Sequence, residues 1–352
     1  MRRILILVGF ITVLVSGIWL GGESLLARQI RELASTGPAF AVEDVTPLRD
    51  LGRIGVRIDK PVFSGPSGNL SLEAADLWIR PLAPSVAELG LPQQARLELM
   101  DGPHDLGLTD PQVRMRFMPL SGFVPAKVEI GSGPVTLDEQ DLASAISLIA
   151  ERAETGTDAP ASSLAAYDLL VDLDAVQPRA VPALAMLVAA LPEGGPLSVA
   201  GKGKVWLDRE PTAKALAMIP QPALTGLRLD EVQIAFGPVS ARAMGEVIAD
   251  AQGYAQGAVA IYTSDAEAML DSASESGMIP GSASRLARSM IRAISGLRMP
   301  GEATDPAEAA AAPARMVYPE ARAGELRLPI IFANGKASLG PVPLGAAPRL
   351  RP

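Results

Sequence analysis

The stretch GELRLPIIFANGKASLGPVPLGAAPRL, residues 324–350, reads as two short strands joined by a tight turn. Apolar and polar residues alternate in Leu326-Arg327-Leu328, which is typical of a strand with one buried face. Asn334-Gly335 is a strong signal for a two-residue hairpin turn. Gly340-Pro341 favours a sheet edge after the hairpin, because proline cannot donate a hydrogen bond to a further strand. The chain is therefore predicted to end on a hairpin that completes a sheet.

The same alternation occurs along most of the chain. It is found in residues 56–59, 70–73, 97–99, 113–117, 127–130, 227–230, 232–234 and 259–261. Strands of this kind belong to antiparallel sheets with one solvated face. The stretch GEVIADAQGYAQGAVAIYTSD, residues 245–265, is rich in alanine, and its glycines favour two strands around a turn over a helix.

Three Gly-Pro pairs follow such strands in similar contexts, VEIGSGPVTL, VQIAFGPVSA and KASLGPVPLG. Their glycines are Gly133, Gly237 and Gly340, which are 104 and 103 residues apart. This spacing suggests repeated β units, although the segments between the copies do not align by eye.

A few helices are expected beside the sheet. Apolar periodicity and capping residues place them at residues 138–154, 181–191, 264–277 and 281–297. The last of these is basic and amphipathic, with Arg285, Arg288 and Arg292 near one face. That face either lies on an anionic membrane or is simply solvated.

The N-terminus has the pattern of a membrane anchor. Arg2 and Arg3 precede Ile4–Leu20, which carries no charge and is about 26 Å long as a helix, just enough to cross the hydrocarbon layer. The arginines place the first residues in the cytoplasm, and Trp19 lies where an interfacial aromatic is expected. A cleaved signal peptide is the alternative, but helical spacing continues through residues 23–35 without a cleavage signature. The rest of the chain is then expected outside the cytoplasm, in the periplasm.

These patterns divide the chain into six segments. They are an anchor and stalk at 1–35, a first β-rich unit at 36–154, a linker at 155–163, a second β-rich unit at 164–299, a flexible linker at 300–315, and the C-terminal hairpin at 316–352. The predicted fold class is α+β and β-rich: an extended curved antiparallel sheet with a few packing helices, preceded by one transmembrane helix.

Composition excludes several kinds of chemistry. The chain of 352 residues has 31 Lys+Arg against 39 Asp+Glu, and its net charge of −8 argues against nucleic acid as a partner. Cysteine is absent and His104 is the one histidine, so disulfides, thiolate catalysis and ordinary zinc sites are not expected. Gly201-Lys202-Gly203-Lys204 lacks the spacing of a phosphate-binding loop and is interpreted as a turn before Val205.

A histidine-dependent site would have to use His104 in MDGPHDLGLTD, with Asp101, Asp105 and Asp110 nearby. The spacing does not match a calcium-binding loop, and a polar turn with an exposed histidine is the simpler interpretation. No catalytic, cofactor-binding or metal-binding residues are therefore predicted. The other candidate site is an apolar sheet face left open by the helices, which would form a trough for acyl chains. If the helices cover that face, the core is an ordinary one.

The anchored start, the stretch at 245–265 and the C-terminal stretch resemble an uncharacterised proteobacterial family, number twenty-one twenty-five of the domain-of-unknown-function series. The chain is also loosely similar to AsmA-like envelope proteins, which implies a role in lipid traffic or envelope assembly. Three hypotheses follow: a non-enzymatic inner-membrane protein that binds or guides phospholipid or other envelope components, a closed interaction scaffold for other envelope proteins, and a carboxylate-based envelope hydrolase.

Overall fold

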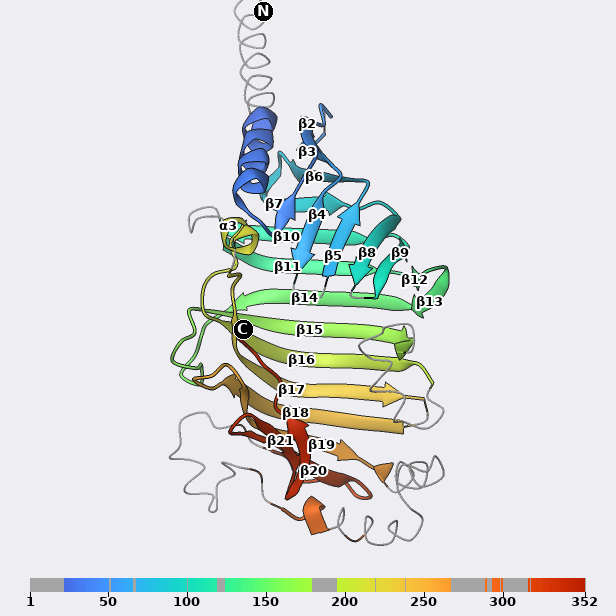
Figure 1. Cartoon of the computed structure of the whole chain (residues 1–352), viewed down its shortest axis with the longest axis vertical. Coiled ribbons are helices and arrows are strands. Elements are labelled where there is room, and N and C mark those ends of the chain that lie inside the picture. The colour runs from blue at the N-terminus through green and yellow to red at the C-terminus, as the bar shows by residue number, and fades with distance from the viewer. Residues whose placement is uncertain are drawn as a thin grey trace, which may run out of the picture. The chain divides into compact units, whose positions relative to one another are not determined.

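The computed structural model describes residues 22–50, 52–65, 68–99, 101–118, 124–178, 195–218, 220–237, 239–266, 289, 293–297, 299, 316 and 318–351. The described chain is dominated by antiparallel strands (Figure 1). It divides into two compact units: unit 1 is residues 1–139 with 211–221, and unit 2 is residues 140–210 with 222–352. Residues 155–163, predicted as a linker, lie between two consecutive strands of unit 2.

Unit 1 contains two antiparallel sheets. The first runs in the order β2 (Asp44–Pro47), β3 (Ile54–Asp59), β6 (Ala74–Arg80), β7 (Ala83–Gly90), β10 (Gln112–Met118) and β11 (Val124–Ser132). The second runs in the order β1 (Phe40–Ala41), β4 (Val62–Gly65), β5 (Gly68–Leu72), β8 (Gln94–Leu99), β9 (Gly102–Leu108) and β12 (Val135–Leu137). The short helix α3 (Ala213–Ala217), capped by the Thr212 side chain, also belongs to this unit.

The core of unit 1 is closed from two directions. Residues 22–36 form a helix, as their spacing predicted, and its Ala27 and Ile30 pack on Val45, Val56 and Ile58 of β2 and β3. A second cluster joins the two sheets, with Leu72 and Ala95 from one and Ala75 from the other. Val45 and Val56 are 0% exposed.

Unit 2 is one long antiparallel ladder preceded by β13 (Gln140–Ala143). Its order is β14 (Ala145–Ala153), β15 (Ala165–Val176), β16 (Leu197–Leu207), β17 (Leu224–Phe236), β18 (Val239–Ala249), β19 (Ala255–Thr263), β20 (Leu326–Ala333), β21 (Lys336–Leu339) and β22 (Val342–Ala346). The order follows the chain throughout, so neighbouring strands are also consecutive in sequence.

The predicted C-terminal hairpin is confirmed. Asn334 and Gly335 both have positive φ, 52° and 70°, which is the left-handed conformation that a tight hairpin turn requires. β21 then pairs with β22, where Pro343 lies in the last strand of the described ladder. The two strands around residues 250–254 are confirmed as β18 and β19.

Residues 138–154 and residues 201–204 were both interpreted wrongly from the sequence. Residues 138–154, predicted as a helix, form β13 and β14, and all of β14 pairs with β15. Residues 201–204, interpreted as a turn, lie in the middle of β16 and pair on both sides. In both cases, pairing with long neighbouring strands prevails over a local pattern that was compatible with either state.

Several predicted features lie wholly or mostly outside the described residues. These are the span Ile4–Leu20, the helices at 181–191, 264–277 and 281–297, and the linker at 300–315. Within the described chain, no helix combines the length and the apolar character needed to cross a membrane.

Candidate functional site

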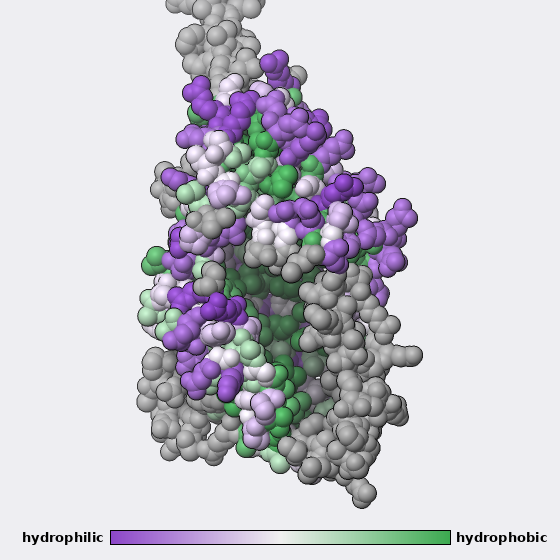
Figure 2. Space-filling view, viewed as in Figure 1, coloured by the Kyte–Doolittle hydropathy of each residue, from purple (hydrophilic) through white to green (hydrophobic). Residues whose placement is uncertain are grey.

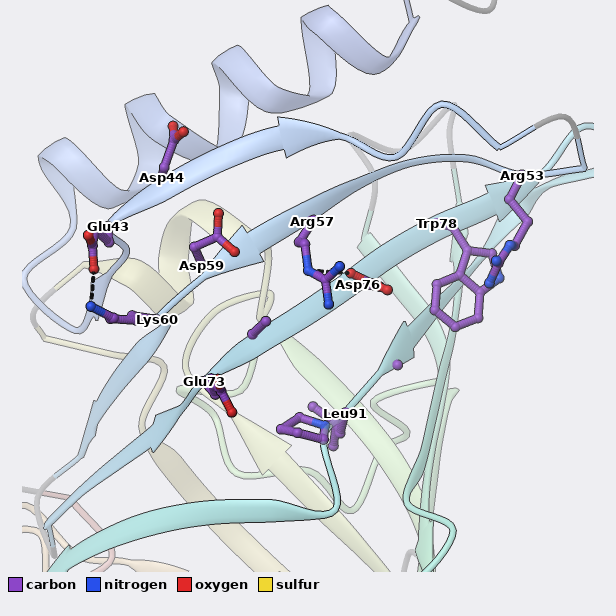
Figure 3. Close-up of a pocket in the computed structure, with 13 residues that line it drawn as sticks. Glu43, Asp44, Arg53, Arg57, Asp59, Lys60, Glu73, Asp76, Trp78 and Leu91 are labelled. Carbon is purple, nitrogen blue, oxygen red and sulfur yellow. Dashed lines mark ion pairs between the residues drawn. The ribbon is translucent and has the colours of Figure 1, made fainter.

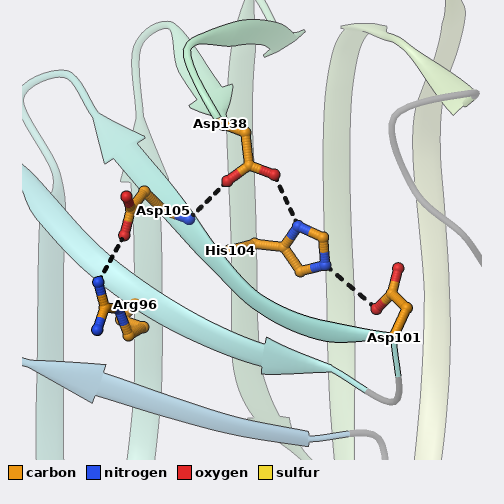
Figure 4. Close-up of polar contacts among 5 residues, drawn as sticks. All are labelled: Arg96, Asp101, His104, Asp105 and Asp138. Carbon is orange, nitrogen blue, oxygen red and sulfur yellow. Dashed lines mark hydrogen bonds and ion pairs between the residues drawn. The ribbon is translucent and has the colours of Figure 1, made fainter.

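His104 is the centre of a polar cluster on unit 1 (Figure 4). It lies in β9, which corrects the prediction of a turn, and its side chain is 18% exposed. Its Nδ1 lies 2.7 Å from Asp138 Oδ2, and its Nε2 lies 3.1 Å from Asp101 Oδ1. The other Asp138 oxygen accepts the Asp105 backbone N–H at 2.8 Å. The cluster thus ties the β8–β9 turn to the turn that follows β12.

The cluster favours a charged histidine. Hydrogen bonds to the carboxylates of Asp138 and Asp101 raise the pKa of His104, and the His104 contact lowers the pKa of Asp138. When protonated, the imidazolium donates to both carboxylates, and it then has no free lone pair with which to act as a base. Asp105 pairs with Arg96 at 3.4 Å, and Asp110 is not in the cluster. The hydrogen bonds link two turns of unit 1, and we call this arrangement the His104 clamp.

A second feature of unit 1 is an open basin of about 800 Å³ lined mainly by charged side chains (Figure 3). Lys60 Nζ lies 2.7 Å from Glu43 Oε2, and Arg57 Nε lies 3.6 Å from Asp76 Oδ1. The Arg53 guanidinium lies over the Trp78 ring, 4.9 Å from its centroid. Because its charges are largely matched in pairs, this basin is a solvated polar face of the first sheet.

The described residues contain no group of three or more His, Asp or Glu side chains arranged to hold a metal ion.

Unit 2 presents a continuous apolar face, which we call the open face. Cross-strand registers place its residues on one side of β14–β18. These residues are Ile146, Leu148, Ala150, Leu169, Val171, Leu173, Val199, Gly201, Gly203, Val205, Leu227, Leu229, Val232, Ile234, Ala241, Ala243, Gly245 and Val247. These positions are uncharged throughout. Figure 2 shows a hollow over β14–β17 with a predominantly hydrophobic wall.

The open face is only half buried. Each of its aliphatic side chains on β14, β15, β16 and β17 has intermediate exposure, and full burial begins at Ala243 and Val247 on β18. Soluble proteins rarely expose contiguous apolar patches of this kind unless the patch binds something. The open face is thus the strongest candidate for a binding surface among the described residues.

The opposite side of the same strands is polar. Lys204 Nζ lies 3.5 Å from Asp168 Oδ1, and the Arg228 guanidinium contacts Asp158 at 2.5 Å and Asp230 at 2.9 Å. Burial raises the pKa of the Glu246 carboxyl, and the charge of Asp158 raises it further. The two sides of the sheet therefore differ sharply, one carrying charge networks and the other hydrocarbon.

One end of the open face is marked by a polar group. In the register row beyond Ala150 and Leu169, Arg152 lies opposite Tyr167 and forms an ion pair with Glu210. Burial, and then the Glu210 charge, raise the pKa of Tyr167 to about 12, so this phenol stays protonated at physiological pH. On β14 and β15 the apolar rows thus end at Arg152 and Tyr167, whereas the same register row continues as Val205 and Leu227 on β16 and β17.

Sequence reasoning identified the possibility of an open apolar face and the alternation of β17, but not all of its strands. β14 was predicted as a helix, and the two glycines of β16 were assigned to a turn. The Asp138 partner of His104 was also missed, because it lies 34 residues away and no local pattern marks the pair.

Comparison with known proteins assigns the chain to a family. A sequence model of DUF2125, described as "Uncharacterized protein conserved in bacteria", matches residues 52–348. The chain belongs to this family. The match covers most of the described part of unit 1 and nearly all of unit 2, which confirms the resemblance drawn from the sequence. No curated protein matches, and no solved structure matches either.

Proposed function

We propose that this DUF2125 protein binds the hydrocarbon part of a membrane lipid on the open face of unit 2, and so binds or guides lipid in the cell envelope. The observation that carries the proposal is the half-exposed, uncharged face formed by β14–β17. Removing apolar surface from water is favourable by about 25 cal/mol per Å², so an acyl chain that covers this face gains from contact along its whole length.

The chemistry of the face favours hydrocarbon over a peptide or a sugar. Backbone N–H and C=O groups of interior strands are used in the ladder, as the registers on both sides of β15, β16 and β17 show. A peptide or sugar laid on this face would lose hydrogen bonds to water and find few replacements. A hydrocarbon chain has no such groups to desolvate.

The proposal places the protein at the bacterial inner membrane with the body in the periplasm. The support is the uncharged segment Ile4–Leu20 behind Arg2 and Arg3. The helix at residues 22–36, which packs on unit 1, follows this segment directly. Such an anchor would hold the open face near a source of phospholipid.

The test uses the full chain. Deleting residues 1–35 would remove Ala27 and Ile30, which belong to the buried cluster of unit 1. The protein is extracted from membranes with detergent, stripped of free lipid, and measured by native mass spectrometry followed by lipid extraction. We expect phospholipid to remain bound at a defined stoichiometry. A lipid-free mass that does not change on incubation with phospholipid would contradict the proposal and favour a closed scaffold.

A matched pair of variants locates the binding. Val232 lies on the open face, and its neighbour Gln233 is exposed on the polar side of the same strand. Val232→Asp places a charge among the apolar side chains and should reduce retained lipid at least tenfold. Gln233→Asp adds the same charge one residue away and should leave lipid retention unchanged. Equal retention by the two variants would place the bound lipid elsewhere.

A further inference from the structure

The helix at residues 22–36 is fixed at its first turn to the start of β3. Glu23 is 0% exposed, and its Oε1 accepts the Gly55 backbone N–H at 3.2 Å. A Cβ atom on Gly22 would lie 3.6 Å from Ile54 Cγ2. The start of the helix and the start of β3 therefore share one end of unit 1, which we call the near end.

The near end lies close to the apolar segment that is predicted to cross the membrane. Gly22 follows Leu20, the last residue of that segment, by two positions, which is at most about 7 Å of chain. A bilayer is about 40–45 Å thick with its headgroups and about 30 Å without them, so each headgroup layer measures about 5–8 Å. With Ile4–Leu20 across the hydrocarbon, the near end is therefore within or next to a headgroup layer.

β3 runs beside the helix in the same direction. At the near end, Glu23 contacts Gly55. Farther along, Arg31 Nε lies 3.6 Å from Asp44 Oδ1, and Asp44 pairs with Asp59 at the end of β3. Between these contacts the helix advances about 12 Å and the strand about 13 Å, so the two are nearly parallel. The β2–β3 turn continues past Gly55, and it therefore extends beyond Glu23 toward the membrane.

This turn presents arginine side chains. Arg49 is exposed, and within the described residues no hydrogen bond or ion pair involves its side chain. Arg53 pairs with Asp50 at 2.6 Å and lies over the Trp78 ring, yet its side chain is 43% exposed. A guanidinium group offers several N–H donors in a geometry that suits phosphate oxygens. The turn therefore carries the chemistry needed to contact lipid phosphates.

Charge differs between the two ends of β2, β3 and β6 (Figure 3). With their adjoining turns, these strands carry three arginines and one aspartate at the near end, a net charge of +2, and four carboxylates and one lysine at the far end, a net charge of −3. The near-end residues are Arg49, Asp50, Arg53 and Arg80. The far-end residues are Glu43, Asp44, Asp59, Lys60 and Glu73. In a chain of net charge −8, the near end is thus the end that suits an anionic surface.

From this geometry we infer that the near end of unit 1 rests on the membrane that holds the anchor, with Arg49 and Arg53 in contact with the phosphates of anionic phospholipids. The inference rests on the proposed placement of Ile4–Leu20 in the inner membrane and does not use the open face. It adds an electrostatic contact to the anchor and holds unit 1 against the bilayer surface.

The experiment uses the absence of cysteine from the chain, which makes any introduced thiol a unique labelling site. The full chain is placed in nanodiscs of phosphatidylethanolamine and phosphatidylglycerol, with a small fluorophore at Gly52→Cys in the β2–β3 turn or at Glu73→Cys at the far end. Both positions are exposed, and a Cβ atom on Gly52 has its nearest neighbour 3.6 Å away. The quencher is a phospholipid that carries a nitroxide on its headgroup.

We expect quenching at Gly52→Cys to exceed that at Glu73→Cys severalfold. Arg49→Glu, added to Gly52→Cys, should reduce the quenching at least twofold, because the turn then repels phosphatidylglycerol. Arg96→Glu is the matched control, since it reverses an exposed charge on the second sheet of unit 1 and should leave the quenching unchanged. Urea unfolding of each labelled variant checks that the fold is kept.

Three outcomes would overturn the inference. Quenching at Gly52→Cys no stronger than at Glu73→Cys would show that the turn does not reach the headgroups. Unchanged quenching after Arg49→Glu would show that the anchor alone sets the position of the turn. A chain that does not enter nanodiscs would contradict the membrane placement itself. None of these results bears on lipid retained by the open face, which native mass spectrometry measures separately.

Discussion

The two units use similar strands for opposite purposes. In unit 1 the apolar side of β2, β3 and β6 is covered by the helix at residues 22–36 and by the second sheet, and Val45 and Val56 are completely buried. In unit 2 the apolar side of β14–β17 remains half exposed over four consecutive strands. Alternating sequence patterns produce both faces, so the difference between them lies in the covering element.

The comparison has an energetic consequence. A covered face contributes to folding, because its side chains leave water when the chain folds. A half-exposed face contributes less and retains apolar surface that a ligand can cover. Unit 2 must then gain its stability elsewhere. Its buried residues include Ala165 and Ala166 on β15 and Trp206 on β16, besides the clusters around Tyr262 and Ala255.

The largest expected effect contrasts the same substitution in the two units. Ile58→Ala removes a side chain that is 5% exposed in the unit 1 core, and it should lower the free energy of unfolding by about 2–5 kcal/mol. Ile234→Ala on the open face should cost about 1 kcal/mol or less, because Ile234 is already partly in water. Urea unfolding followed by hydrogen exchange of peptides from each unit measures the two losses separately. Equal losses would show that the face of unit 2 is as well covered as that of unit 1.

A smaller effect is expected from two glycines. Gly245→Ala introduces a Cβ atom against the backbone of β19 and should destabilise unit 2 by about 1–3 kcal/mol through overpacking. Gly65→Ala in unit 1 is the control, since its added Cβ has its nearest neighbour 3.7 Å away, and the change should stay within about 0.5 kcal/mol. The same unfolding measurement applies. A neutral Gly245→Ala would mean that β18 and β19 shift enough to admit the added Cβ atom.

Much of this architecture follows from the sequence. Period-two alternation identified segments in both units because each strand has one wet and one dry side, and Asn334-Gly335 fixed the C-terminal turn by its backbone requirement. The helix predicted at residues 138–154 was wrong because the segment fits two patterns. Leu142, Ile146 and Ile149 have helical spacing, whereas Ile146, Leu148 and Ala150 alternate as on one face of a strand. Only the partner strand β15 decides between these patterns, and single-sequence reasoning does not include it.

The sites were harder to predict than the strands. Whether an apolar face is covered depends on contacts between distant segments, such as Ala27 of the helix with Val56 of β3. The close backbone contacts at the glycines depend on register, which pairs Leu229 with Gly203 on one side and Gly245 on the other, although the three are far apart in sequence. The contact of His104 with Asp138 also joins residues that are 34 positions apart in sequence. Residue types predicted which faces and contacts each segment could form. Pairing between distant strands decided where in the fold those faces and contacts lie.

The smallest expected effect concerns pH and separates the units again, because the His104 clamp belongs to unit 1 alone. The raised pKa of His104 means that its stabilising contribution is full below the ordinary value of 6.5 and is lost as pH rises through the raised pKa. The lowered pKa of Asp138 means that its contribution is present above the ordinary value of 3.8 and is lost as pH falls through the lowered pKa. The clamp should therefore be strongest between about pH 4 and 6.5.

His104 is the only histidine, so its imidazole resonances in an NMR titration are unambiguous. We expect a midpoint above 6.5 in the native chain and a lower midpoint in Asp138→Asn, where the partner that raises the pKa most is neutral and Asp101 remains. Hydrogen exchange around the β8–β9 turn should quicken above that midpoint beyond the intrinsic pH dependence of exchange, whereas peptides of β15–β17 should show no such excess. An unshifted midpoint in the native chain would mean that the contacts of His104 with the two carboxylates do not persist in solution. The stability of unit 1 would then depend on its covered core alone.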